Sequence, residues 1–149
     1  MNIRFLQAED AVAWQQLWSA YLDFYQASVP DAVSRHTWQR LLDTDSPIHG
    51  FGAFADDGRL LGFAHCVMHP NTWNSSDCCY LEDLFTDASA RRQGVARALV
   101  QAVYAEARRR QCNRVYWCTQ AGNTGAQALY RQLAQQTDMI QFRHNLPEY

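Results

Sequence analysis

The sequence of 149 residues contains no lysine, so all 13 of its basic side chains are arginines. It also has no run of 18 or more apolar residues, which argues against a transmembrane helix. Residues 1–5 lack the apolar stretch and the cleavage site of a signal peptide. Together these absences predict a globular protein that works in the cytoplasm.

Cysteine occurs five times, but in no pattern typical of a disulfide framework or a zinc site. The number is odd and no two cysteines have C-x-x-C spacing. We therefore expect reduced thiols that pack as small hydrophobes, and no metal. The cysteines are Cys66, Cys78, Cys79, Cys112 and Cys118.

Charge is distributed unevenly along the chain. Residues 1–90 carry 12 acidic and 4 basic side chains, whereas residues 91–149 carry 3 acidic and 9 basic ones. One interpretation is a solvated surface of uneven sign. The other is an arginine-rich half that faces a polyanionic cofactor and an acidic half that receives a cationic substrate. The net charge of −2 argues against nucleic acid as a partner.

The first half of the chain predicts a strand followed by two helices. Ile3–Leu6 is a short apolar run, and apolar or aromatic residues at positions 14, 17, 18, 21, 22 and 25 then follow helical spacing. This aromatic face is compatible with a substrate wall, but packing on a sheet is the favoured interpretation. We expect Pro30 to end this helix and a weaker helix to follow at Ser34–Leu42.

The middle of the chain predicts a β-hairpin. His49–Ala55 and Arg59–Met68 are apolar runs separated by the turn Asp56-Asp57-Gly58. A polar loop then contains Trp73, which is compatible with a role in gripping a substrate or a second subunit and equally with packing on a sheet edge.

The second half alternates helices and strands. We expect a helix from Val95, a buried strand at Arg114–Thr119 and a second helix with a capping box at Thr124-Gly125-Ala126-Gln127. Met139–Phe142 predicts a last strand. The order of elements predicts one α+β domain over residues 1–149, with a mostly antiparallel sheet that includes some parallel pairing.

The stretch Tyr80–Val100 contains the clearest candidate site. It predicts a strand, a short loop with small and basic residues, and the start of a helix. Gly94 and Ala96 have little bulk, so a ligand can approach the backbone N–H groups at the helix start. Such amides favour an anion such as phosphate, although the loop matches neither the P-loop nor the three-glycine dinucleotide pattern. On this pattern alone, ordinary turn chemistry is an equally good interpretation.

Arg91-x-x-Gly94-x-Ala96 resembles the Arg/Gln-x-x-Gly-x-Gly/Ala loop that holds the pyrophosphate of coenzyme A in the GCN5-related N-acetyltransferases, the GNAT superfamily. The strand Tyr80–Phe85, the strand Arg114–Thr119 and the segment Asn123-x-x-Ala126-x-x-Leu129-Tyr130 occur in the family's order. The resemblance extends from about Leu60 to Leu133. Residues 69–73 and 80–85 look like the branch of spermidine/spermine acetyltransferases and Hpa2-like proteins. The run 129–136 departs from many relatives because it lacks glycine.

The resemblance implies a GNAT fold, α+β, with six to seven strands and about four helices. It also implies that an amine attacks the thioester of acetyl-CoA directly. A lysine-like amine has a pKa of about 10.4, so its deprotonation at pH 7 costs roughly 4 to 5 kcal/mol. Glu82 matches the position of the general base in the polyamine enzymes, and the alternative is a carboxylate that binds the amine or an arginine. In a regular strand Asp83 would face away from Glu82. Tyr130 matches the general acid, and its alternative is core packing.

The resemblance further implies a set of residues that bind acetyl-CoA. They are Leu84, Phe85, Thr86, Arg91, Arg92, Gln93, Gly94, Val95, Ala96, Arg97 and Asn123. Asn123 has turn and cap chemistry as its alternative role. The expected partners are a small-molecule or peptide amine and a second subunit in a homodimer, with no nucleic acid and no membrane. A CoA-binding module without catalysis is the alternative function. The sequence does not distinguish a polyamine, a free amino acid, an aminoglycoside or a protein lysine as the acceptor.

Overall fold

The computed structural model describes residues 1–147, and the chain divides into two compact units. The first unit is Met1–Cys118 and the second begins at Thr119. Within the described residues, no helix is both long and apolar enough to span a bilayer. Each unit has its own helices or strands.

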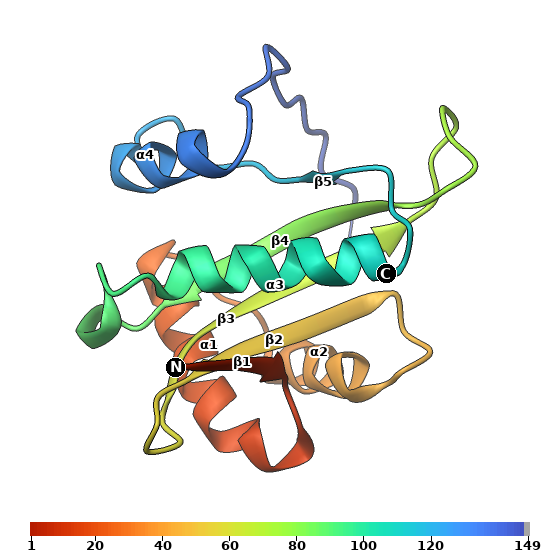
Figure 1. Cartoon of the computed structure of the whole chain (residues 1–149). Coiled ribbons are helices and arrows are strands. Elements are labelled where there is room, and N and C mark those ends of the chain that lie inside the picture. The colour runs from red at the N-terminus through yellow and green to blue at the C-terminus, as the bar shows by residue number, and fades with distance from the viewer. Residues whose placement is uncertain (148–149) are drawn as a thin grey trace. The chain divides into compact units, whose positions relative to one another are not determined.

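A five-stranded sheet organises the first unit, in the order β1-β2-β3-β4-β5 (Figure 1). Its strands are β1 (Asn2–Phe5), β2 (Ile48–Phe54), β3 (Leu60–His69), β4 (Cys78–Thr86) and β5 (Val115–Tyr116). The first four pair antiparallel, and β5 pairs parallel to β4. The mixed α+β fold and the hairpin of β2 and β3 are confirmed.

Helices cover both faces of this sheet. They are α1 (Ala11–Phe24), α2 (Asp31–Leu42) and α3 (Val95–Arg109), with short 3-10 helices at Ala8–Asp10 and Ala88–Ala90. Phe63 of β3 packs against Trp18 of α1, whereas its neighbour Gly62 lies so close to α3 that a Cβ there would be 3.0 Å from Val95. Because successive residues of a strand point to opposite faces, α1 and α3 lie on opposite sides of the sheet.

The main apolar core lies between the sheet and the helices α1 and α2. It is built from Leu6, Trp14, Leu17, Trp18, Leu41, Phe54, Leu60, Phe63 and Phe85. The aromatic face of the first helix is therefore used mainly for packing, as favoured from the sequence.

A β-bulge interrupts β4 at Glu82. His65 of β3 pairs with Asp83 and the next residue, Cys66, pairs with Leu81, so Glu82 is the extra residue. Beyond the bulge Asp83 meets His65 on the α1 side, whereas before it Leu81 pairs with Cys66, the next residue of β3, and so lies on the other side of the sheet. The alternation thus changes phase at Glu82, so the regular strand on which the expectation for Asp83 rested is interrupted here.

Two predicted strands are wrong in whole or in part. Of Arg114–Thr119 only Val115 and Tyr116 form a strand, and Tyr116 is exposed. Pairing of β5 with β4 ends at Tyr80, just before the bulge, and bulges commonly terminate pairing. Met139–Phe142 forms no strand, and most of its side chains are exposed. Residues 1–147 therefore hold five strands and not six or seven, because β propensity alone does not supply a partner edge.

The helix boundaries also differ from the prediction. The first helix ends at Phe24, before Pro30, and Pro30 is the N-cap of α2, which starts at Asp31. The second unit contains α4 (Thr124–Leu133), whose N-cap is Asn123. The predicted capping box is wrong, because the Gln127 amide donates to the carbonyls of residues 120 and 121.

Candidate functional site

A loop with two left-handed residues leads into α3. Arg92 has φ +62° and Gly94 has φ +81°, and Gly94 is the N-cap of the helix. The Ala98 N–H donates to the Gly94 carbonyl at 3.0 Å, which closes the first helical turn. A Cβ built on Gly94 would meet nothing within 4 Å, so the backbone here faces open space. The loop and helix start are therefore where the sequence predicted them.

The geometry of this loop suits an anion. The first N–H groups of a helix have no acceptor within the helix, and the helix dipole adds positive potential at the same end. Arg91, Arg92 and Gln93 are exposed beside it. Arg91 also lies 5.6 Å from the ring of Phe24, which ties the loop to the end of α1. The sequence resemblance implies that these donors bind the diphosphate of coenzyme A.

The strand before the loop has an open edge. In the described part of the chain, β5 pairs with β4 only at Cys79 and Tyr80, so no strand covers this edge from Leu81 to Thr86. An exposed edge can pair with an added extended segment. Leu84, Phe85 and Thr86 lie on this stretch, as expected for residues that bond the amide-bearing arm of coenzyme A.

Glu82 stands at the bulge with a perturbed pKa. Glu82 is exposed at the surface, but desolvation by its surroundings is the largest cause that raises its pKa, and the neighbouring charge of Asp83 adds to it. The charge of Arg40 on α2 acts in the opposite direction on this pKa.

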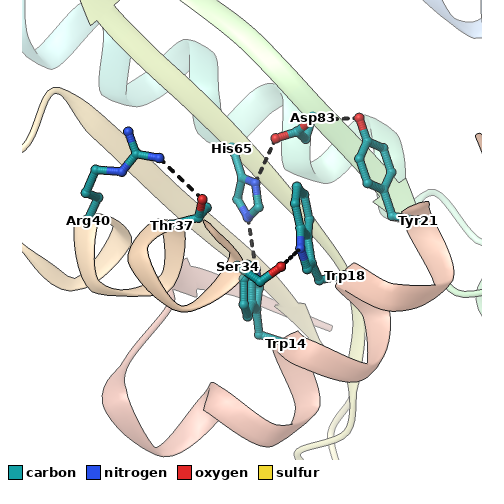
Figure 2. A network of polar contacts seen from close by, with 8 residues as sticks. All are labelled: Trp14, Trp18, Tyr21, Ser34, Thr37, Arg40, His65 and Asp83. Carbon is teal, nitrogen blue, oxygen red and sulfur yellow. Dashed lines mark hydrogen bonds and ion pairs between the residues drawn. The ribbon is translucent and has the colours of Figure 1, made fainter. Parts of the chain in front are cut away.

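Asp83 is held by a chain of hydrogen bonds that the sequence did not reveal. The Asp83 Oδ2 lies 2.9 Å from His65 Nδ1, and its Oδ1 accepts from the Tyr21 hydroxyl at 2.7 Å. On the far side of the ring, the Trp14 indole N–H donates to His65 Nε2 at 3.0 Å. Figure 2 shows these side chains converging from α1, β3 and β4.

The chain of bonds fixes the protonation state of His65. An indole N–H can only donate, so His65 Nε2 must be the unprotonated acceptor. The proton is then on Nδ1, where it is donated to Asp83, and the ring is neutral. His65 is only 2% exposed and Asp83 15%. Burial, with the Asp83 charge as the next cause, raises the pKa of Tyr21, so its hydroxyl stays a neutral donor. Asp83 is thus a largely buried carboxylate bound by two neutral groups.

No sequence pattern identified this network. His65 lies in an apolar strand and Tyr21 in an apolar helical face, where a packing role is the ordinary interpretation. The sequence periodicity places these polar side chains at core positions. Because buried polar groups need hydrogen-bond partners, this was the available sign of a network.

Two predicted residues belong to the second unit and are described within it. Asn123 precedes α4, and its Nδ2 lies 3.4 Å from the Thr119 hydroxyl. Tyr130 lies on α4, is half-buried, and its carbonyl accepts from the Ala134 N–H at 2.8 Å. The other predicted site residues, Glu82 and those from Leu84 to Arg97, all belong to the first unit.

The cysteines form no metal centre in residues 1–147, where no group of three or more potential ligands occurs. All five are free thiols. Three of them, Cys66, Cys78 and Cys79, are fully buried in the sheet.

Comparison with known proteins gives a consistent result. The model of the Acetyltransferase (GNAT) family matches residues 14–134. The D-amino-acid N-acetyltransferase HPA3 of Saccharomyces cerevisiae (strain ATCC 204508 / S288c) is 33% identical over 144 residues, which cover 96% of this chain and 89% of HPA3.

Solved structures show the same fold. The structure of AAC(6')-Iy with a bisubstrate analogue, CoA-S-monomethyl-acetylneamine, has a TM-score of 0.84 at 25% identity and covers 98% of each chain. The aminoglycoside N-acetyltransferase AAC(6')-Iy in complex with CoA has a TM-score of 0.82 at 26% identity, covering 97% of this chain and 93% of its own.

Replacing Gly94 with alanine should weaken coenzyme A binding by about tenfold. A residue with a Cβ disfavours positive φ by about 1–2 kcal/mol, so relaxation of this residue turns the amides at the helix start away from the anion. Isothermal titration calorimetry measures the effect.

Gly58→Ala is the matched control, because Gly58 also has a positive φ and open space around it, but lies in the hairpin turn. Gly58→Ala should lower thermal stability to a similar extent as Gly94→Ala, but it should leave the affinity for coenzyme A unchanged. Equal weakening in both variants would mean that the loop has no specific role.

Proposed function

The chain belongs to the GNAT family of acetyltransferases, and on that premise we propose that it transfers the acetyl group of acetyl-CoA to the primary amine of a small molecule. The observation that carries this proposal is the family match over residues 14–134, which includes β4, the anion-binding loop and α4. Because the match spans both units, we also propose that residues 1–149 act as one acetyltransferase domain.

The residues proposed to hold the co-substrate are those that the sequence resemblance implies, and the geometry of the loop and of the open edge supports them. The loop from Arg91 to Arg97 would bind the diphosphate, the edge at Leu84–Thr86 would bind the pantetheine arm, and Asn123 would contact the same arm or the adenine portion. Bound acetyl-CoA supplies an activated acyl group as a thioester. In the transfer an N–C bond forms, the C–S bond breaks, one proton leaves the nitrogen and another reaches the sulfur.

Glu82 is proposed as the general base that takes the proton from the substrate ammonium, directly or through a water. Its raised pKa supports this role, because a stronger base accepts a proton from an amine more readily. Its exposed place at the bulge, next to Asp83, also allows it to attract the ammonium.

The pH dependence of kcat/KM should reveal this base. Glu82 works only when it is ionised, so activity should rise with pH through the raised pKa of Glu82. Glu82→Gln should lower kcat/KM by about 100-fold and remove this acidic limb. Asp83→Asn should shift the limb to lower pH, since loss of the neighbouring negative charge lowers the pKa of Glu82. An unchanged profile in both variants would assign the base to another group.

Tyr130 is proposed as the general acid that protonates the leaving thiolate. Tyr130→Phe should lower kcat by about 100-fold and change coenzyme A affinity little, because only proton transfer is lost. Steady-state kinetics and calorimetry separate the two effects. Tyr104→Phe on α3 is the control and should remain active. A Tyr130→Phe enzyme with the rate of the wild type would leave Tyr130 with a packing role only.

A panel of amines tests the function itself. Purified protein is mixed with acetyl-CoA and polyamines, amino acids, aminoglycosides or basic peptides, and released thiol is measured. We expect turnover with at least one small amine, since the named relatives are an acetyltransferase for D-amino acids and one for aminoglycosides. Tight acetyl-CoA binding without thiol release on any amine would instead indicate a CoA-binding module.

Two finer expectations remain predictions. The cytoplasmic location rests on the sequence features given above, and the homodimer rests on the apolar tail and on Trp73, whose side chain is 90% exposed.

A further inference from the structure

Arg40 presents an unused donor near His65 and Asp83 (Figure 2). It lies near the end of α2, and its neighbour Leu41 anchors that helix on the sheet. The Arg40 Nη2 donates to the Thr37 hydroxyl at 3.3 Å, which is a long hydrogen bond. Its Nε is buried and has no hydrogen-bond partner among residues 1–147. A buried donor without an acceptor is costly, so an acceptor from outside the chain is expected here.

The charge of Arg40 is also unpaired. In the described residues Arg40 forms no ion pair, although its charge influences Glu82. An arginine stays protonated at all relevant pH values, and its planar fork matches a carboxylate. In Figure 2 the Arg40 guanidinium and Asp83 appear on either side of His65.

Among residues 1–147 the carboxylate of Asp83 likewise has no cationic partner. His65 is neutral, so the charge of Asp83 is held by neutral donors and not by a cation. Glu82 adds a second carboxylate next to it. This region thus offers one cation and two adjacent carboxylates that form no ion pair with it, which matches a ligand that carries both an ammonium and a carboxylate.

We propose that Arg40 binds the carboxylate of the acceptor, so that this enzyme acts on free amino acids and selects them over amines that lack a carboxylate. The proposal rests on the proposed function. The ammonium of the amino acid is attracted to Glu82 and Asp83, and the carboxylate forms charge-assisted hydrogen bonds with the guanidinium. The same positive charge repels the second ammonium of a diamine and so disfavours polyamines.

Matched pairs of acceptors test the proposal. D- and L-phenylalanine are compared with phenethylamine, which has the same ring and amine but no carboxylate, and D- and L-lysine with cadaverine. The wild type should show a higher kcat/KM for one enantiomer of each amino acid than for its amine partner. Higher values for phenethylamine and cadaverine would overturn the proposal.

Substitution of Arg40 then locates the selectivity. Arg40→Gln should raise KM for the preferred amino acid by about 10- to 100-fold, with kcat changed by less than about threefold and phenethylamine unaffected. Arg40→Lys keeps the positive charge but loses the planar guanidinium. Its KM for the preferred amino acid should lie between the values of the wild type and Arg40→Gln. Arg35→Gln, an exposed arginine on the same helix, is the control and should behave as the wild type.

The outcomes separate this inference from the proposed function. An equal loss with phenylalanine and phenethylamine in both Arg40 variants would show a structural role and overturn the inference alone. Acetyl transfer to no acceptor by the wild type would overturn the proposed function. Calorimetry with coenzyme A on each variant reports whether the fold and the cofactor loop are intact.

Discussion

The bulge at Glu82 is the constraint on which the site depends. One extra residue in β4 changes the phase of its side chains, so Asp83 and Phe85 face α1 while Leu81 and Cys79 do not. Pairing with β5 ends at Tyr80, two residues before the bulge, and among the residues that the structure describes the later edge of β4 is open. The same short stretch of β4 therefore holds the start of an open edge and two adjacent carboxylates, Glu82 and Asp83.

The bonds around Asp83 determine which charges this face presents. Trp14 keeps His65 neutral, because its indole N–H occupies the one nitrogen that protonation would need. Asp83 consequently accepts hydrogen bonds from two neutral donors, Tyr21 and His65. Buried carboxylates are usually paired with a cation, so this arrangement is suited to a cationic ligand. The packing of the aromatic helix and the electrostatics of the site are therefore coupled.

The uneven charge of the chain has two separate uses. Arg109 and Arg110 bind Glu106 within α3, and their hydrogen bonds lower the pKa of that carboxylate to about 2. These arginines stabilise a helix and are not available in full to a ligand. Arg91 and Arg92 are exposed at the loop before α3. The N-terminal end of the helix dipole there is positive, like the arginine side chains. The arginines of residues 91–149 thus divide into some that stabilise α3 and others, such as those of the loop, that remain exposed.

The sequence by itself determined the features that arise from neighbours along the chain. These features are the hairpin at Asp56-Asp57-Gly58, the amphipathic helices and the loop at Gly94. They depend on local periodicity and on backbone preferences, and both are properties of residues close together in the sequence. The bulge, the Asp83 network, the unpaired Arg40 and the early end of β5 were decided only by tertiary structure. Each depends on which strand or helix lies alongside, and residues far apart in sequence, such as Trp14 and His65, meet only in the fold. Met139–Phe142 shows the same limit, since a pattern suited to a strand forms none without a partner edge.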